Sequence, residues 1–162
     1  MKEPCFACGG LFPPAASGAT HAYMASTPGC WEAYGVLLAR EYADAALFAR
    51  VHRLTVDAFA LQHPGDASER RARQSFWIHG AALWLVLRMG RPQAEATAAL
   101  KRLADGDFPA PPPGAAFALT HADVLAAPEA EHERRVKAWA EAALAGCAAA
   151  HADFAALAQR AG

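Results

Sequence analysis

The sequence predicts an all-α fold, a helical bundle of about five helices preceded by a cysteine-rich loop segment. Three observations predict this fold. From residue 30 onward, apolar residues recur at spacings of three and four, as on the buried face of a helix. No stretch alternates convincingly between apolar and polar residues, as a half-buried strand does. The first 29 residues are rich in Gly, Pro, Ala and Ser, so we expect loop over 1–29 and bundle over 30–162, within one structural domain.

Length and charge exclude several classes of protein. A chain of 162 residues can bury one core but is short for two. Lys and Arg number 15 against 16 Asp and Glu, so no bulk charge attracts nucleic acid or an anionic membrane. The first residues lack the apolar run of a signal peptide, and the longest apolar run, 80–87, is far below the roughly 20 residues that span a bilayer. We therefore expect a soluble cytoplasmic protein, in which cysteines serve as metal ligands or buried thiols.

The N-terminal loop contains a CxxCG turn formed by Cys5, Cys8 and the glycine that follows. In such a turn two thiolates converge on one ion, while glycine lets the backbone turn sharply. Two further donors, His21 and Cys30, give the spacing C-x2-C-x12-H-x8-C. This donor set predicts a Zn²⁺ site, a zinc-knuckle-like structure that would hold the long loop in place. His52 is the alternative fourth ligand.

The helix boundaries follow from capping residues and from the prolines and glycines that end helices. The helices are expected over residues 30–41, 45–63, 68–90, 92–104 and 128–158. Asp44 and Ser68 are the N-caps expected for the second and third helices, and Pro64 stops the second. Residues 105–116 are too rich in proline to continue a helix, and residues 120–123 are typical of a short capped turn.

The second helix carries two stripes of side chains. The first is the apolar stripe of a bundle helix and consists of Leu47, Val51, Leu54, Ala58 and Leu61. The second lies roughly 110° round the helix and consists of Phe48, His52, Thr55, Phe59 and His63. One neighbouring helix would not cover both stripes. We therefore expect the cysteine-rich segment to pack against the second stripe, around His52.

Several motifs in the first 90 residues resemble the signature of an uncharacterised bacterial protein family. The matching stretches are CFACG from Cys5, THAY from Thr20, STPGCW from Ser26, REY from Arg40 and VHRLTVDAFALQHPG from Val51. Members of that family carry a CxxCG turn, an SPGCW-like helix start and an HxLTVDxYxxQHPG helix. This chain departs from the pattern at Phe59, where the family has Tyr, and at Thr27, where Ser is usual. The resemblance implies no established activity.

Four polar residues of the bundle are candidate catalytic residues. They are His52, His63, His79 and Asp57. His52 and His63 are eleven residues apart, about 16 Å along a helix, so they cannot bind one ion together. His79 on the third helix is expected to lie nearer His52, so that pair is the more plausible one.

The remaining polar residues have simpler interpretations. Asp57 is expected to be a buried cap or to pair with Arg70 or Arg73. Together with Arg71, these two arginines are otherwise expected to form a solvated face. Three further histidines show no shared spacing and are expected at the surface; they are His121, His132 and His151. Cys147 is expected to be a small core residue.

Three classes of function fit these patterns. The first is a zinc-stabilised helical protein that binds a small molecule or a protein partner, with the metal mainly structural. The second is a metal-dependent enzyme that uses the bundle histidines to activate water or a substrate atom. The third is a thiol redox protein that uses Cys5 and Cys8. We place structural zinc first, and the sequence names neither a reaction nor a specific partner.

Overall fold

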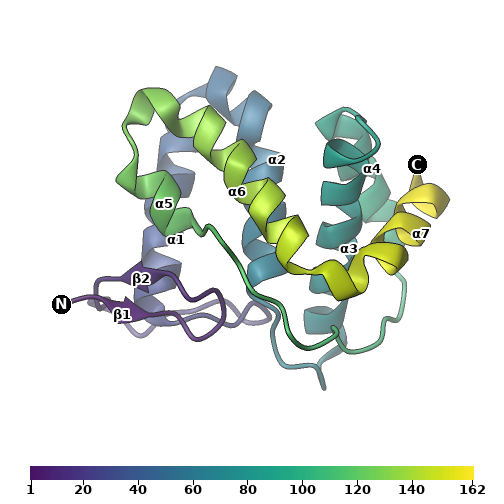
Figure 1. Cartoon of the computed structure of the whole chain (residues 1–162), viewed down its shortest axis with the longest axis horizontal. Coiled ribbons are helices and arrows are strands. Elements are labelled where there is room, and N and C mark those ends of the chain that lie inside the picture. The colour runs from purple at the N-terminus through teal and green to yellow at the C-terminus, as the bar shows by residue number, and fades with distance from the viewer.

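The structure is a computed structural model that describes residues 1–162, and it confirms the all-α prediction (Figure 1). The α-helices are α1 (Pro28–Ala43), α2 (Ala45–Gln62), α3 (Arg70–Leu87), α4 (Gln93–Leu103), α5 (His121–Ala126), α6 (His132–Gly146) and α7 (His151–Ala161). Two 3₁₀ turns, η1 (Glu129–Glu131) and η2 (Ala148–Ala150), precede α6 and α7. The only sheet pairs β1 (Glu3–Pro4) with β2 (Leu11–Phe12), a hairpin that the sequence did not predict. None of the helices is long and apolar enough to cross a membrane.

Helix α2 is the centre of the arrangement. Helix α6 packs across one side of it and α3 along another, while α7 and α4 pack on α3 (Figure 1). The strand hairpin, α1 and α5 lie at the end of the molecule opposite α4 and α7 (Figure 1). The apolar stripe predicted for α2 is confirmed, since Val51, Ala58 and Leu61 are fully buried. The largest buried side chains from other helices are Trp139 on α6 and Phe154 on α7.

The predicted second stripe of α2 exists, but another helix covers most of it. Helix α1 lies along the stripe, where Tyr34 stacks on Phe59 with ring centroids 3.8 Å apart. The Glu41 carboxylate of α1 lies 2.8 Å from His52 Nδ1. The cysteine-rich segment reaches the stripe only at its C-terminal end, at His63. The expectation that this segment packs around His52 was therefore wrong, because the turn at residue 44 folds α1 back along α2.

Side-chain caps begin three of the seven α-helices, α1, α2 and α5. Asp44 caps α2 as predicted, with Oδ1 accepting from the amides of Ala46 at 2.9 Å and Leu47 at 3.0 Å. Ser68 is not the cap of α3, which begins two residues later, after Glu69. The Glu69 side chain makes no capping hydrogen bond.

The long C-terminal helix predicted over 128–158 is wrong. The chain bends at Cys147, where ψ is 38°, and η2 separates α6 from α7. The bend directs α6 onto α2 and α7 onto α3, so one apolar stripe serves two partners (Figure 1). Gly146 makes the bend compact, since a Cβ there would lie 2.4 Å from the carbonyl oxygen of Ala116. A periodicity of three and four continues through the bend, and sequence spacing alone therefore did not reveal it.

Gly80 provides a test of the packing between α3 and α7. A Cβ at Gly80 would lie 2.2 Å from the ring of Phe154, which is fully buried and cannot move aside freely. We expect Gly80→Ala to lower the free energy of unfolding by about 1–3 kcal/mol, the usual cost of overpacking a core. This corresponds to a fall in Tm of about 2–12 °C. Thermal unfolding followed by circular dichroism would measure it.

Gly35 is the matched control for that substitution. It lies within α1, is exposed, and has no atom within 4 Å of the added Cβ. Gly35→Ala should raise the stability by about 0.5–1 kcal/mol, because alanine loses less backbone entropy in a helix. Equal stability of the two variants would contradict the close packing of α3 on α7.

Candidate metal centre

The CxxCG turn lies at the tip of the N-terminal hairpin. The strands pair Pro4 with Leu11, and the Cys5 amide donates to the Gly10 carbonyl at 2.8 Å. The Gly9 amide donates back to the Cys5 carbonyl at 2.8 Å, and Gly9 has φ of +76°, where an L side chain would be strained. The Gly10 amide lies 3.4 Å from Cys8 Sγ. This turn brings both sulfurs to one side, with an amide directed at one of them.

Cys30 reaches the turn from the first turn of α1. The Thr27 hydroxyl accepts from the Cys30 amide at 3.4 Å, which fixes the start of the helix. Gly29 lets the N-terminal loop approach closely, since a Cβ there would lie 2.0 Å from the carbonyl oxygen of Pro13. The N-terminal end of a helix also favours a thiolate electrostatically.

His63 is the C-cap of α2, immediately before the proline that ends the helix. Its Nδ1 lies 2.7 Å from the carbonyl oxygen of Phe59, a group that can only accept, so Nδ1 carries the proton. The neutral imidazole therefore presents the lone pair of Nε2, which lies 3.2 Å from Cys30 Sγ. A backbone carbonyl that orients a histidine in this way is the usual outer partner of a metal ligand.

Four donors converge at this point from three separate parts of the chain. The ligand atoms of Cys5, Cys8, Cys30 and His63 all lie within 4.8 Å of one another, and all four residues are buried. A tetrahedral site with bonds of about 2.3 Å to sulfur and 2.0 Å to nitrogen would place its ligand atoms about 3.5–3.8 Å apart. The cluster could therefore hold a metal ion with small adjustments of its side chains.

The two histidines expected as the fourth ligand lie elsewhere. His21 packs edge-on against Tyr23, with its Nδ1 3.3 Å from the Tyr23 amide, and its ring contacts Trp31. His52 contacts Glu41. The structure therefore places His63, rather than His21 or His52, beside the three cysteines. The sequence separation of 33 residues between Cys30 and His63 is too long for any ligand spacing to predict, and the abrupt end of the helix at HPG was the only local signal.

The three thiols strongly perturb one another. Contacts with Cys30 and Cys8 hold the pKa of Cys5 far below its usual range. Contacts with Cys5 and Cys8, together with burial, raise the pKa of Cys30 far above it. For Cys8 the contact with Cys30 lowers the pKa, but contact with Cys5 and burial outweigh this effect and raise it to about 12. One thiol thus ionises readily while the other two resist, and a divalent cation would stabilise all three thiolates at once.

His121 is a second histidine that sequence reasoning missed, since it was expected at the surface. It is fully buried, its ring stacks on Phe12 at 4.5 Å, and its Nε2 lies 3.1 Å from the Cys30 carbonyl oxygen. Burial, with a smaller effect from His63, lowers the pKa of His121 to about 3, so the ring is neutral and donates to that carbonyl. Thr120 places it there by capping α5 in a capping box with Asp123. His121 therefore helps to fix the position of the Cys30 backbone through this hydrogen bond.

A comparison with known protein families shows which family this chain matches. The profile of a family of unknown function, DUF5946, matches residues 3–148. The chain belongs to DUF5946. This confirms the expected membership of an uncharacterised family, and the match includes the four clustered donors but ends before α7. No curated protein and no solved structure matches the chain.

The DUF5946 chain also buries two carboxylates within the bundle. Glu41 accepts from the Thr55 hydroxyl at 2.5 Å and contacts His52 Nδ1 at 2.8 Å and His132 Nε2 at 3.1 Å. This network joins α1, α2 and α6, and it buries His132, which had been expected at the surface. His52 and His79 therefore do not form the expected pair, because His79 contacts the second carboxylate, Asp57.

Asp57 is held by its own helix and by α3. Arg53 donates to it through Nε at 3.0 Å and Nη2 at 2.6 Å, and His79 Nδ1 lies 2.6 Å from Oδ1. The expected partners Arg70 and Arg73 do not reach Asp57; Arg73 pairs instead with Asp107 at 3.0 Å. The i,i+4 spacing of Arg53 and Asp57 is the sequence feature that could have predicted this ion pair.

Cys147 lies apart from the metal centre, and its chemistry gives a direct prediction. It is 4% exposed at the bend between α6 and α7, and burial raises its pKa to about 12. The thiol therefore stays protonated at pH 8, and only the thiolate reacts with alkylating reagents. We expect Cys147 to remain unmodified by iodoacetamide in the folded protein and to react fully in denaturant, as measured by peptide mass spectrometry. Rapid modification of the folded protein would contradict its burial.

Proposed function

We propose that this chain is a small zinc-binding helical protein in which one Zn²⁺, bound by Cys5, Cys8, Cys30 and His63, has a mainly structural role. The observation that carries the proposal is the convergence of four buried donor atoms within 4.8 Å. Three thiolates and an imidazole form a ligand set that zinc prefers. Four protein ligands leave no open coordination position, as is typical of structural rather than catalytic zinc.

The positions of the ligands explain what the metal would stabilise. Cys5 and Cys8 belong to the hairpin, Cys30 to the start of α1 and His63 to the end of α2. The same N-terminal segment also pairs with the chain beyond α2, where Met24 bridges Pro64. We infer that the metal joins the loop segment 1–29 to the bundle 30–162, so that both fold as one structural domain.

The test is elemental analysis of protein purified without chelator. We expect one zinc per chain in the wild-type protein and a loss of most of it in His63→Ala. His21→Ala is the matched control, because it removes an imidazole from the same segment as the cysteines but leaves the four donors intact, and it should keep the zinc.

Two outcomes would overturn the proposal. Zinc lost with His21 and kept without His63 would contradict the ligand set. A wild-type protein that contains no metal, and whose Cys5 and Cys8 form a disulfide with a measurable reduction potential, would favour the thiol redox function instead.

A further inference from the structure

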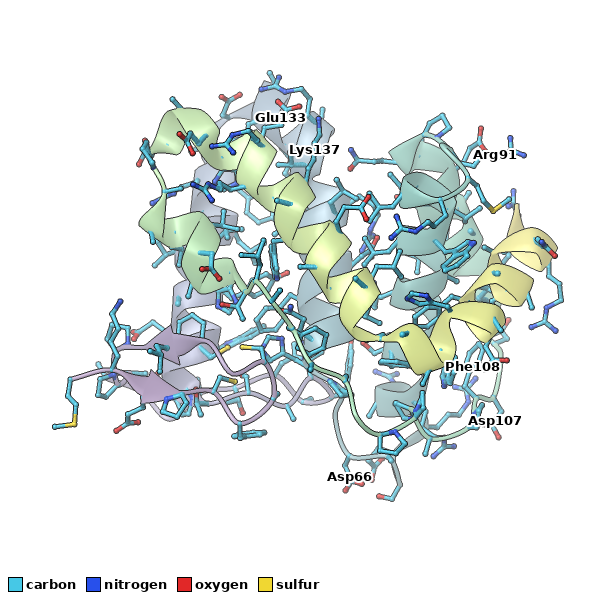
Figure 2. The ribbon with its side chains drawn as sticks, in the orientation of Figure 1. Asp66, Arg91, Asp107, Phe108, Glu133 and Lys137 are labelled. Carbon is cyan, nitrogen blue, oxygen red and sulfur yellow. The ribbon has the colours of Figure 1, made fainter.

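We propose that a cavity on the α3 side of the molecule binds the phosphate group of a small phosphorylated molecule. The cavity measures about 260 Å³ and is lined mostly by polar side chains. These are Tyr23, Arg70, Arg71, Gln74, Ser75 and His79. The site is separate from the cysteine cluster and shares no donor with it. It lies at the start of α3, after the turn that carries Asp66 at the lower edge of the molecule (Figure 2).

The two arginines of this cavity form no ion pair, although Asp107, whose pKa is lowered first by its hydrogen bond with Arg73, lies near enough to Arg70 for that charge to lower it further. Arg73, one turn further on, pairs with Asp107, which lies with Phe108 on the loop beside α7 (Figure 2). Arg70 contacts only the carbonyl oxygen of Gly106, at 3.2 Å, and Arg71 makes no hydrogen bond or ion pair. Guanidinium groups with free donors are the side chains that bind phosphate oxygens in pairs.

His79 is oriented so that its second nitrogen is available at the cavity. Its Nδ1 lies 2.6 Å from the buried Asp57 carboxylate and 3.4 Å from Arg53 Nη2. Because the carboxylate can only accept, the shorter contact fixes the proton on Nδ1. Nε2 has no protein partner and is not buried. With a proton on both nitrogens, Nε2 would donate to a phosphate oxygen while Nδ1 keeps its contact with Asp57.

Ser75 gives an independent indication that the cavity takes a polar group. Its residue is 5% exposed, and its hydroxyl is buried without a hydrogen-bond partner. A buried hydroxyl without a partner is costly, and a donor of this kind in the wall of a cavity suits an oxyanion. Gln74, which also lines the cavity, donates to the Ala104 carbonyl and so ties α3 to the end of α4. The arrangement combines two cations, one imidazole and one hydroxyl around one small space.

The experiment titrates the zinc-loaded protein with inorganic phosphate and follows the ring signals of His79 and the guanidinium signals of Arg71 by NMR. We expect saturable shifts at both residues, and affinity reduced about tenfold or more in Arg71→Gln and in His79→Gln. Arg160→Gln is the matched control: it removes one unpaired charge on α7, outside the cavity, and should bind phosphate as the wild type does. Zinc content should be unchanged in all three variants, which separates this test from the one of the metal centre.

Three results would overturn the proposal. The first is the absence of saturable shifts at His79 and Arg71. The second is equal weakening by Arg71→Gln and Arg160→Gln, because binding would then reflect net charge alone. The third is equally strong binding of acetate, which would show that the cavity does not distinguish a phosphate from a carboxylate. A repeat with phenyl phosphate in place of inorganic phosphate would show that an organic group is accommodated.

Discussion

Replacement of Cys30 by serine is expected to abolish metal binding and to unfold the N-terminal half of the protein. Cys30 is fully buried, and its sulfur lies 3.2 Å from His63 Nε2 and 3.9 Å from His121 Nε2. Structural zinc contributes about 10–16 kcal/mol of apparent binding energy in zinc-finger peptides, which is comparable to the whole stability of a typical domain, about 5–15 kcal/mol. Loss of even part of this energy would leave the affected part of the protein unfolded at room temperature, so its cooperative thermal transition would no longer be observed. Circular dichroism and elemental analysis of Cys30→Ser would measure both effects.

Cys147→Ser is the matched control for this experiment. It replaces another buried cysteine, which lies in the core cluster but has no part in the group of four donors. We expect this variant to keep its metal and a cooperative transition. Adding a strong chelator to the wild-type protein should reproduce the behaviour of Cys30→Ser. A Cys30→Ser variant with wild-type Tm and wild-type metal content would contradict a structural role for the site.

Replacement of Glu41 by alanine is expected to have the second largest effect. The carboxylate is fully buried and is the common partner of Thr55, His52 and His132. Removing it leaves two imidazoles and a hydroxyl without an acceptor, and breaking a buried network of this kind costs about 3–5 kcal/mol. For a chain of this size the fall in Tm should be about 6–20 °C.

Thermal unfolding of the metal-loaded protein tests this prediction, with Glu32→Ala as its control. Glu32 lies on the same helix, is exposed and makes no ion pair, so its removal should change Tm very little. Glu41→Gln retains the shape and one acceptor oxygen and should fall between the two. Tm values for Glu41→Ala and Glu32→Ala that agree within experimental error would show that the network does not hold α1 to α2 and α6.

Most of the helices and three of the four clustered donors, Cys5, Cys8 and Cys30, could be predicted from the sequence. Helix α2 was predicted to within one residue at its C-terminal end because Asp44 and Pro64 are strong local signals. The CxxCG turn was also a local pattern, since its two sulfurs are set by a few residues of backbone. The hairpin that presents the turn was missed because strands of two residues are too short to show alternation.

The other parts depended on contacts between distant segments. His63 and His121 reach the centre from 33 and 91 residues beyond Cys30, and no spacing rule connects such positions. The bend at Cys147 was hidden for a similar reason. The apolar stripe runs through the bend without interruption in the sequence. Only the three-dimensional structure shows that the part before the bend packs on α2 and the part after it packs on α3.

The sequence by itself determined the helical class, most of the helix boundaries, the pair of thiols in the turn and the family. Each of these depends on residues within one or two turns of one another, where spacing and backbone preference are sufficient. The tertiary structure alone decided that His63 lies where His21 was expected. It also decided that Glu41 contacts His52 and His132, while Asp57 contacts His79. It also decided that Arg71 and His79 share a cavity. These outcomes depend on how α1 and α3 pack against α2, because packing sets which side chains from distant positions come within bonding distance.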